Sequence, residues 1–343
     1  MVNSEMIVVE DLVKEYPNGV RAVSGINFTV PEGEFFGFLG PNGAGKSTTI
    51  KVLSTLIRKT AGRVIVAGFD IDKDALEIRR HIGFAMQEVG LDDLSNGLDF
   101  LVLQGMLYGM SRTDSCRRAD ELLSLVGLNS VAMRQVGTYS GGMRRRIDLV
   151  AALMHSPILL FLDEPTTGLD PQSRLAIWDY LQQLNAQGMT VFLSTHIMEE
   201  ADRLCERIAI IDTGTLVAAG TPQQLKSQVG GDVVKVIFST PPSGSEEGDI
   251  SKAIDVVRQR EYVLDASVTE GGLTINVHNG DESAPDLLRI FHDQGMYVAN
   301  LSVSRPSLDD VFLKYTGKQI RDSAPSTTSA TQSIRPWSRI RRR

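Results

Sequence analysis

Short apolar segments alternate along the chain with longer segments whose apolar residues recur at helical spacing. The segments with a strand-like pattern are residues 6–9, 26–30, 35–39, 63–67, 82–86, 158–162, 190–194 and 208–212. A helix is expected directly after the third of them, from Lys46 to about Leu56. Because strands separated by helices form mostly parallel sheets that are covered on both faces, this alternation predicts an α/β domain.

A predominantly helical region at residues 98–128 interrupts this alternation. Its leucines are spaced so that they give apolar faces to helices. These leucines are Leu101, Leu103, Leu107, Leu122, Leu123 and Leu125. We therefore expect a helical subdomain at about residues 90–155, inserted between strands of a first domain that spans residues 1–229.

A second pattern begins at about Gly230. It has strands at residues 233–238, 263–269, 273–277 and 298–304, and helices at 250–260 and 285–294. The order βαββαβ is that of a ferredoxin-like α+β domain. A last helix at 307–315 follows from the helical spacing of Leu308, Val311, Phe312 and Tyr315. We expect it to close this second domain, residues 230–317, by packing on the small sheet; a regulatory surface is the alternative.

The end of the chain, residues 318–343, is rich in Ser, Thr, Ala and Arg and contains few apolar side chains. Burial there cannot offset the entropy of ordering the chain, so the composition predicts a disordered basic tail. The arginines around Trp337 are suited to contact anionic lipid, and a merely solvated tail is the simpler interpretation.

Composition and charge narrow the function classes. The formal net charge is −7 and the sequence pI is about 5.4, so nucleic acid is not an expected partner. Cys116 and Cys205 lie far apart in sequence, which is typical of a reducing compartment. No apolar run approaches the roughly 20 residues of a membrane span, and the N-terminus lacks the pattern of a signal peptide. If the protein serves transport, we expect another chain to supply the pore.

The strand at 35–39 is followed by GPNGAGKST, which matches the P-loop pattern GxxxxGK[ST] between a strand and a helix. Its glycines let backbone N–H groups face a phosphate, and the following helix adds its positive dipole end. Lys46 is expected to reach the β- and γ-phosphates and Ser47 to ligate Mg²⁺. The nucleotide-binding residues predicted here are Gly40, Pro41, Asn42, Gly43, Ala44, Gly45, Lys46, Ser47 and Thr48.

The wholly apolar strand at 158–162 leads directly into Asp163 and Glu164. A carboxylate at the rim of a buried sheet is well placed to hold Mg²⁺, so Asp163 is the expected metal ligand. Since Asp163 is committed to metal, Glu164 is the candidate base that orients and deprotonates the attacking water. These elements predict hydrolysis of a nucleoside triphosphate without distinguishing among P-loop proteins.

The segment YSGGM, from Tyr139 to Met143, resembles the LSGGQ signature of the ABC ATPases at its three central positions. A Ser-Gly-Gly turn that opens a helix suits a γ-phosphate, because the hydroxyl, the backbone N–H groups and the helix dipole point one way. Three arginines follow, and the pattern leaves open whether Arg144, Arg145 and Arg146 bind phosphate or form a solvated helix face.

Further positions match that family in the family's order. Tyr16 stands where the adenine-stacking aromatic occurs, Gln87 ends a strand as the Q-loop glutamine does, and Asp170 occupies the D-loop position. His196 matches the switch histidine that contacts the γ-phosphate. The resemblance implies ATP and Mg²⁺ as cofactors, with Gln87 joining Ser47 and Asp163 at the metal. It implies catalytic roles for Lys46, Gln87, Glu164 and His196.

In the ABC family two nucleotide-binding domains close face to face. The Ser140, Gly141 and Gly142 turn of one chain is therefore expected to complete the ATP site of a second copy. The resemblance implies a dimer that ATP closes and hydrolysis opens.

The match can be narrowed to a branch of the family. YSGGMRRRID, together with RPSLDDVFLKYTG at the end of the second domain, is similar to the daunorubicin-resistance branch of bacterial exporters. The implied function is an ATP-hydrolysing subunit, peripheral at the cytoplasmic face of the membrane, that powers export of a drug, lipid or polyketide through a separate permease. A soluble ABC protein acting on ribosomes or DNA is the alternative, disfavoured by the single compact cassette. A small-molecule-sensing role for residues 230–317 is a third possibility, and no convergent polar cluster supports it.

Overall fold

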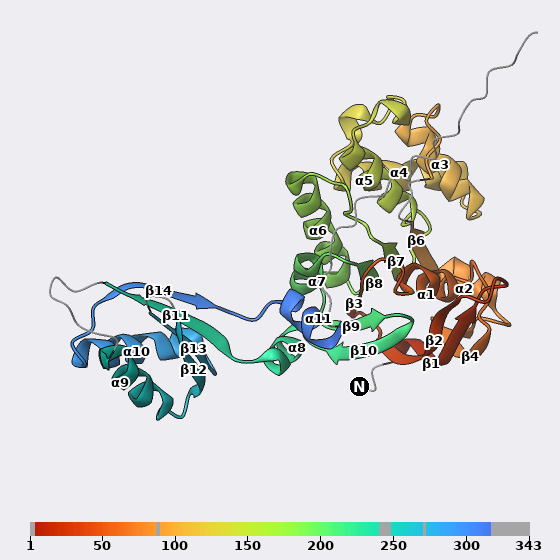
Figure 1. Cartoon of the computed structure of the whole chain (residues 1–343). Helices are drawn as coiled ribbons and strands as arrows, with labels where there is room; N and C mark the ends of the chain where they lie inside the picture. Colours follow the sequence, from red (N-terminus) through yellow and green to blue (C-terminus); the bar gives the residue numbers. More distant parts are fainter. Residues whose placement is uncertain (1–3, 87–89, 240–247, 270–271, 317–343) are drawn as a thin grey trace, which may run out of the picture.

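A computed structural model describes residues 4–86, 90–239, 248–269 and 272–316 (Figure 1). Within these ranges the strands form two four-stranded sheets and one six-stranded sheet. Gln87 and the tail at 318–343, both named by the sequence predictions, lie outside the described residues.

The six-stranded sheet is the centre of the N-terminal part and has the order β10-β9-β3-β8-β7-β6. Its strands are β3 (Phe35–Leu39), β6 (Ile82–Ala85), β7 (Leu159–Asp163), β8 (Thr190–Thr195), β9 (Arg207–Asp212) and β10 (Thr215–Gly220). All pairs except β9 with β10 are parallel. Every residue of β3, β7 and β8 is buried, which explains their continuous apolar pattern. The mostly parallel α/β prediction is confirmed.

An antiparallel sheet lies beside it, with strands β1 (Glu5–Glu15), β2 (Arg21–Pro31), β4 (Ala61–Val66) and β5 (Phe69–Asp70). The strand β1 is much longer than its predicted segment at 6–9. The reason is a register shift between Val9 and Leu12, where Asp11 has a φ of 49°. A bulge of this kind breaks the period-two alternation on which strand prediction depends.

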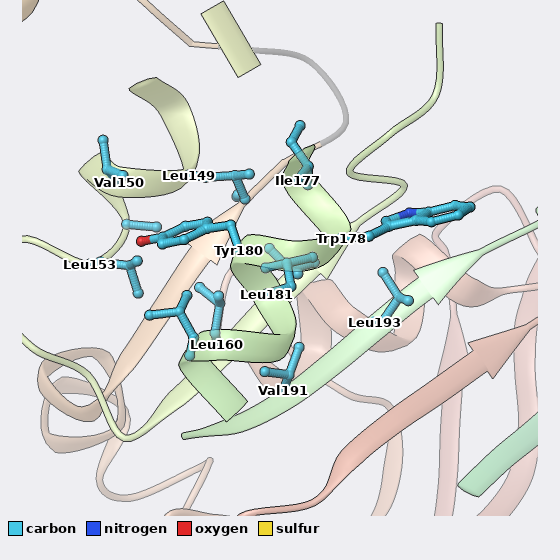
Figure 2. Packing of buried hydrophobic residues seen from close by; sticks show 14 of the residues in the cluster. Leu149, Val150, Leu153, Leu160, Ile177, Trp178, Tyr180, Leu181, Val191 and Leu193 are labelled. Atoms are coloured by element: carbon cyan, nitrogen blue, oxygen red, sulfur yellow. The ribbon is translucent and has the colours of Figure 1, made fainter. Parts of the chain in front are cut away.

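The helices of the N-terminal part cover the six-stranded sheet and form a separate helical group. They are α1 (Lys46–Leu53), α2 (Ala75–His81), α3 (Gly97–Leu107), α4 (Arg112–Leu125), α5 (Gly141–Ala151), α6 (Pro171–Ala186), α7 (Met198–Leu204) and α8 (Pro222–Val229). Figure 2 shows α6 contributing Ile177, Trp178 and Leu181 to a core that includes Leu149 of α5 and Leu193 of β8. This core joins the helical group to the sheet.

Of the six leucines that mark the helical group in the sequence, three are buried and three are exposed. Leu101, Leu122 and Leu123 are buried as expected, because they face the shared core. The other three leucines, Leu103, Leu107 and Leu125, are 54%, 71% and 48% exposed. Helical spacing marks which residues share a face, but α3 and α4 carry apolar residues on more than the face they bury.

The C-terminal sheet has the strands β11 (Asp232–Phe238), β12 (Val263–Thr269), β13 (Gly272–Val277) and β14 (Val298–Ser304) in the antiparallel order β12-β13-β11-β14. The helices α9 (Gly248–Arg258) and α10 (Gly280–Asp293) belong to the same unit. This unit has its own core, which includes Val234, Leu273 and Phe291. The strand order confirms the ferredoxin-like prediction.

The last helix, α11 (Leu308–Thr316), does not pack on the small sheet, so that expectation was wrong. Its buried residues Leu308, Val311 and Phe312 belong to the core of the N-terminal part. In Figure 1 α11 lies beside α8 and α7, away from β11 to β14. Tyr315 donates a hydrogen bond to the side chain of Gln228 near the end of α8. The small sheet is thus attached to the N-terminal part through both of its ends.

None of the helices in the described ranges is both long and apolar enough to span a membrane.

Candidate functional site

The loop between β3 and α1 curls around the side chain of Lys46. Lys46 is 4% exposed, and its Nζ donates to the carbonyl oxygens of Gly40 at 2.8 Å and Pro41 at 3.1 Å. The turn requires glycine at Gly45, which has a φ of 110° and where a Cβ would lie 2.4 Å from the carbonyl oxygen of Ala22. Because α1 begins at Lys46, the helix N-terminus and the loop face the same space, as in phosphate-binding loops.

Asp163 lies at the carboxyl end of β7, beside the start of α1. Its Oδ1 accepts hydrogen bonds from Ser47 Oγ at 3.1 Å and from Ser194 Oγ at 2.5 Å. The side chain is 3% exposed, so it is held in one orientation by these two hydroxyls. The structure therefore brings together the two predicted metal ligands that it describes, Ser47 and Asp163.

The donor set fits a magnesium ion. A hydroxyl and a carboxylate are hard oxygen ligands, and Mg²⁺ is usually held by one or two protein groups together with phosphate oxygens and water. Within the described residues no group of three or more His, Cys, Asp or Glu side chains forms a metal site. A site that needs the nucleotide to complete it is consistent with both observations.

Glu164, the next residue, connects the P-loop lysine to the predicted switch histidine. Its Oε1 lies 3.3 Å from Lys46 Nζ and 3.2 Å from His196 Nδ1. Burial raises the pKa of Glu164, but its hydrogen bond with His196 and the charge of Lys46 lower that pKa by more. The pKa of Lys46 is also lowered, because burial outweighs its attraction to Glu164 and Asp163. The carboxylate is consequently ionised at neutral pH.

The backbone of Glu164 is in the left-handed region, with a φ of 50°. Such a conformation is uncommon for a residue with a side chain and persists only where surrounding contacts hold it. The N–H of Glu164 donates to the carbonyl oxygen of Ser194 at 3.0 Å, and Thr167 Oγ1 donates to Glu164 Oε2 at 3.3 Å. The carboxylate is therefore aimed at Lys46 and His196 by a fixed main chain.

Tyr16 lies at the edge of the same loop. Its hydroxyl is 3.3 Å from Thr48 Oγ1, and Lys14 Nζ lies 5.1 Å from its ring centroid. Thr48 belongs to the first turn of α1. The structure thus places Tyr16 beside the P-loop, next to the first turn of α1.

The Ser-Gly-Gly turn forms the start of α5. Ser140 is the N-cap, and its Oγ accepts from the N–H of Met143 at 3.3 Å. A Cβ at Gly141 would meet nothing within 4 Å, whereas one at Gly142 would lie 2.4 Å from Ser173 Oγ on α6. Asp170 caps α6 by accepting from the N–H of Ser173 at 2.9 Å. The signature turn consequently lies against the first turn of α6, which Asp170 caps.

The predicted residues thus fall into two groups in one chain. The first group surrounds Lys46 at the ends of β3, β7 and β8. The second group, at the starts of α5 and α6, belongs to a different part of the fold, and Figure 1 shows α5 well separated from α1.

Two polar positions in this region escaped the sequence interpretation. Arg145 is 4% exposed and binds main-chain carbonyls, so the arginine triplet is not simply a solvated face. Glu200 is fully buried and accepts hydrogen bonds from Thr166 Oγ1 at 2.8 Å and Trp178 Nε1 at 2.9 Å. No sequence motif identifies these contacts, because the partners lie 20 to 34 residues away in the chain.

Comparisons with known proteins agree with this geometry. The profile of the ABC transporter family matches residues 23–167, and that of the ATP-binding protein DrrA1-3-like C-terminal domain matches residues 220–316. The daunorubicin resistance ATP-binding protein DrrA2 of Streptomyces coeruleorubidus is 41% identical over 88% of this chain and 92% of its own length. The linearmycin resistance ATP-binding protein LnrL of Bacillus subtilis is 39% identical over 92% of this chain and 100% of its own length.

Solved structures show the same cassette. The dimeric ATP-binding cassette MJ0796 bound to ADP and Pi superposes with a TM-score of 0.59 at 29% identity, covering 63% of this chain and 98% of that one. The cbiO1 protein of Clostridium perfringens superposes with a TM-score of 0.61 at 26% identity, covering 65% and 91%. The chain belongs to the ABC transporter family, as an ATP-hydrolysing ATP-binding subunit of the daunorubicin and doxorubicin resistance branch.

Proposed function

We propose that two copies of this chain close around MgATP, and that closure and hydrolysis drive a separate membrane permease that exports a drug-like, lipid or polyketide compound. The observation that carries the proposal is the convergence of Lys46, Glu164 and His196 beside the Ser47 and Asp163 pair. The relatives named for resistance to daunorubicin, doxorubicin and linearmycin support export of such compounds.

In this proposal each side chain has a role that follows from its place. Lys46 leaves its ion pair with Glu164 and binds the β- and γ-phosphates. Ser47 and Asp163 hold Mg²⁺, which when bound neutralises charge on the phosphate oxygens. Glu164, ionised because of its lowered pKa, accepts the proton of the attacking water. His196, in contact with Glu164, orients the γ-phosphate, and Gln87 completes the metal site. The ring of Tyr16 stacks on adenine.

The second half-site serves the partner copy. Ser140 and the N–H groups of Gly141 and Gly142 open α5, so they offer a hydroxyl, backbone donors and a positive helix end to a γ-phosphate. The open space around Gly141 is where a phosphate can approach the main chain. Asp170 lies at the same edge and is proposed to line the closed dimer interface. Two ATP molecules are then enclosed between two chains.

The permease is proposed to dock on the helical subdomain. Leu103, Met106 and Leu107 follow helical spacing on α3 and are 54%, 48% and 71% exposed. A contiguous exposed apolar face of this kind is typical of an interaction site. Docking there keeps the chain peripheral, at the cytoplasmic face of the membrane. Residues 1–229 then form the ATP-binding domain and 230–317 an accessory domain whose last helix returns to it.

Phosphate release from MgATP by the full-length chain tests the ATPase part. Lys46→Ala removes the cation that faces the transferred phosphate, and we expect turnover to fall by at least about 10²-fold. Lys51→Ala, on the same helix but in no predicted site, is the matched control and is expected to retain turnover. Equal turnover in Lys46→Ala and the control would exclude the proposed use of this loop.

Transport is tested separately with inside-out membrane vesicles that contain the chain and its permease. ATP-dependent accumulation of daunorubicin, a lipid probe or a linear polyketide is expected, and it should disappear with Lys46→Ala. Hydrolysis without accumulation of any of the three probes would refute export of these compounds while leaving the ATPase assignment intact.

A further inference from the structure

The middle arginine of the triplet after the signature turn is in an unusual environment. Arg145 is 4% exposed, whereas Arg144 and Arg146 are only partly buried. Arginine is rarely buried unless its guanidinium is fully paired, because desolvation of the charge is costly. The position of Arg145 therefore calls for specific partners.

Those partners are main-chain carbonyls on either side of Glu164. Arg145 Nε donates to the carbonyl oxygen of Pro165 at 2.7 Å, and Nη2 donates to that of Asp163 at 3.3 Å. These acceptors are the last residue of β7 and the second residue after that strand. A single guanidinium thus holds the residue before and the residue after the proposed base.

A third contact reaches a different strand. Arg145 Nη1 donates to the carbonyl oxygen of Met86, directly after β6, and to Asp148 Oδ2 at 3.0 Å. Met86 directly precedes Gln87 in the sequence. The carboxylate of Asp148, one helical turn further along α5, provides the opposite charge. The guanidinium is therefore a junction between α5, the end of β6 and the end of β7.

This junction matters because of the backbone at Glu164. Its φ of 50° is not a conformation that a residue with a side chain keeps without support. Ser194 binds the N–H of Glu164, and Arg145 binds the carbonyls that flank it. If these carbonyls lost their donor, the carboxylate would be free to turn away from Lys46 and His196.

We propose that Arg145 is a positioning residue for hydrolysis, which fixes Glu164 in its strained backbone and ties it to the helix that begins with the Ser140 turn. The inference rests on the proposed function, since it assigns catalysis to Glu164 and the partner's phosphate to Ser140. The inference adds a physical connection between Glu164 and the Ser140 turn. When the partner's ATP draws the start of α5 inward, the same rigid helix carries the guanidinium that holds Glu164. Binding of the partner's ATP at the Ser140 turn thereby affects the position of the proposed catalytic base, Glu164, in the other ATP site.

Arginine is suited to this task in a way that lysine is not. Its planar group donates from Nε, Nη1 and Nη2 in fixed directions, so it can bind three carbonyls on two separate segments. An ammonium group at the same place keeps the charge beside Asp148 but cannot span the three acceptors. Arg145→Lys is therefore a conservative variant that separates charge from geometry.

The test compares Arg145→Gln and Arg145→Lys with Arg144→Gln in the full-length chain. Arg144 is the matched control because it lies on the same helix and pairs with exposed Asp93 at 2.6 Å. For Arg145→Gln we expect kcat for MgATP to fall by about 10²-fold, as for other small misplacements of reacting groups, with little change in KM. Arg145→Lys should lie between Arg145→Gln and wild type, and Arg144→Gln should match wild type.

A double-mutant cycle with Glu164→Gln distinguishes positioning from general support of the fold. If Arg145 acts through Glu164, then Arg145→Gln has almost no further effect on single-turnover hydrolysis once Glu164→Gln is present. Losses that multiply, or a wild-type kcat in Arg145→Gln, would overturn the inference. So would loss of folding in both Arg145 variants, seen by circular dichroism, because the role would then be structural. Failure of the wild-type chain to hydrolyse MgATP would instead remove the proposed function.

Discussion

Replacing Glu164 by Gln should separate ATP binding from ATP hydrolysis. Glutamine keeps the size of the side chain and can still accept from Thr167 Oγ1, which lies 3.3 Å from Glu164 Oε2. The substitution removes a negative charge that lies 3.3 Å from Lys46 Nζ. The side chains of Lys46 and Glu164 are each only 4% exposed. At an effective dielectric constant of about 20, two unit charges at this separation attract by about 5 kcal/mol.

If Lys46 binds the phosphates as proposed, it must turn away from Glu164, so that attraction competes with ATP in the wild-type site. If only about 1.4 kcal/mol of it acts against binding, the variant binds ATP about tenfold more tightly. Loss of a general base lowers turnover by about 10² to 10⁴-fold. Tighter binding and slower turnover act together, so Glu164→Gln is expected to accumulate as a dimer with bound ATP.

Three measurements check this expectation on the full-length chain. Equilibrium dialysis with ATP gives the affinity, phosphate release gives turnover, and size-exclusion chromatography with light scattering gives the fraction of dimer. Glu121→Gln, an exposed residue on α4, is the control and should match wild type in all three. Turnover close to wild type would refute Glu164 as the base, and weaker ATP binding would refute the competition inferred from the Lys46 pair.

Two further predictions concern stability. Burial raises the pKa of Asp148 from 3.8 to about 6, against the opposing charge of Arg145. Between these values the folded chain holds a proton that the unfolded chain has released, so the free energy of unfolding loses about 3 kcal/mol as pH rises through this window. In Asp148→Asn the free energy of unfolding, measured by denaturant titration at several pH values, should not show this loss. The same pH dependence in the variant as in wild type would contradict the prediction. Phe312→Ala should lower the free energy of unfolding of the N-terminal part by about 3 to 5 kcal/mol, since α11 completes its core. Urea titrations followed by tryptophan fluorescence measure this, with exposed Leu313→Ala as control, and an effect confined to the small sheet would disprove that packing.

The sequence predicted best those parts of the site that are local. The P-loop, the Asp163 and Glu164 pair and His196 each follow a buried strand, and the ends of adjacent parallel strands meet at one edge of a sheet. That is why Lys46, Glu164 and His196 converge as the order of the motifs suggested. The partner of α11 could not be predicted in the same way. The spacing of Leu308, Val311 and Phe312 indicates a buried face, but it does not tell whether that face joins the core of the N-terminal part or the core of the small sheet.

The arginine triplet shows where periodicity carries more information than residue type. On α5 the buried positions include Gly142, Arg145 and Leu149, which are spaced by three and four residues and so share one face. The helical period therefore places Arg145 toward the core, although its charge suggests a solvated surface. Three of its acceptors could not be identified from the sequence, because they are main-chain carbonyls, and every residue has one. A buried arginine on the inner face of a helix thus indicates that hydrogen-bond acceptors lie nearby in the fold, and in this chain two of them are the carbonyls that flank the proposed catalytic base.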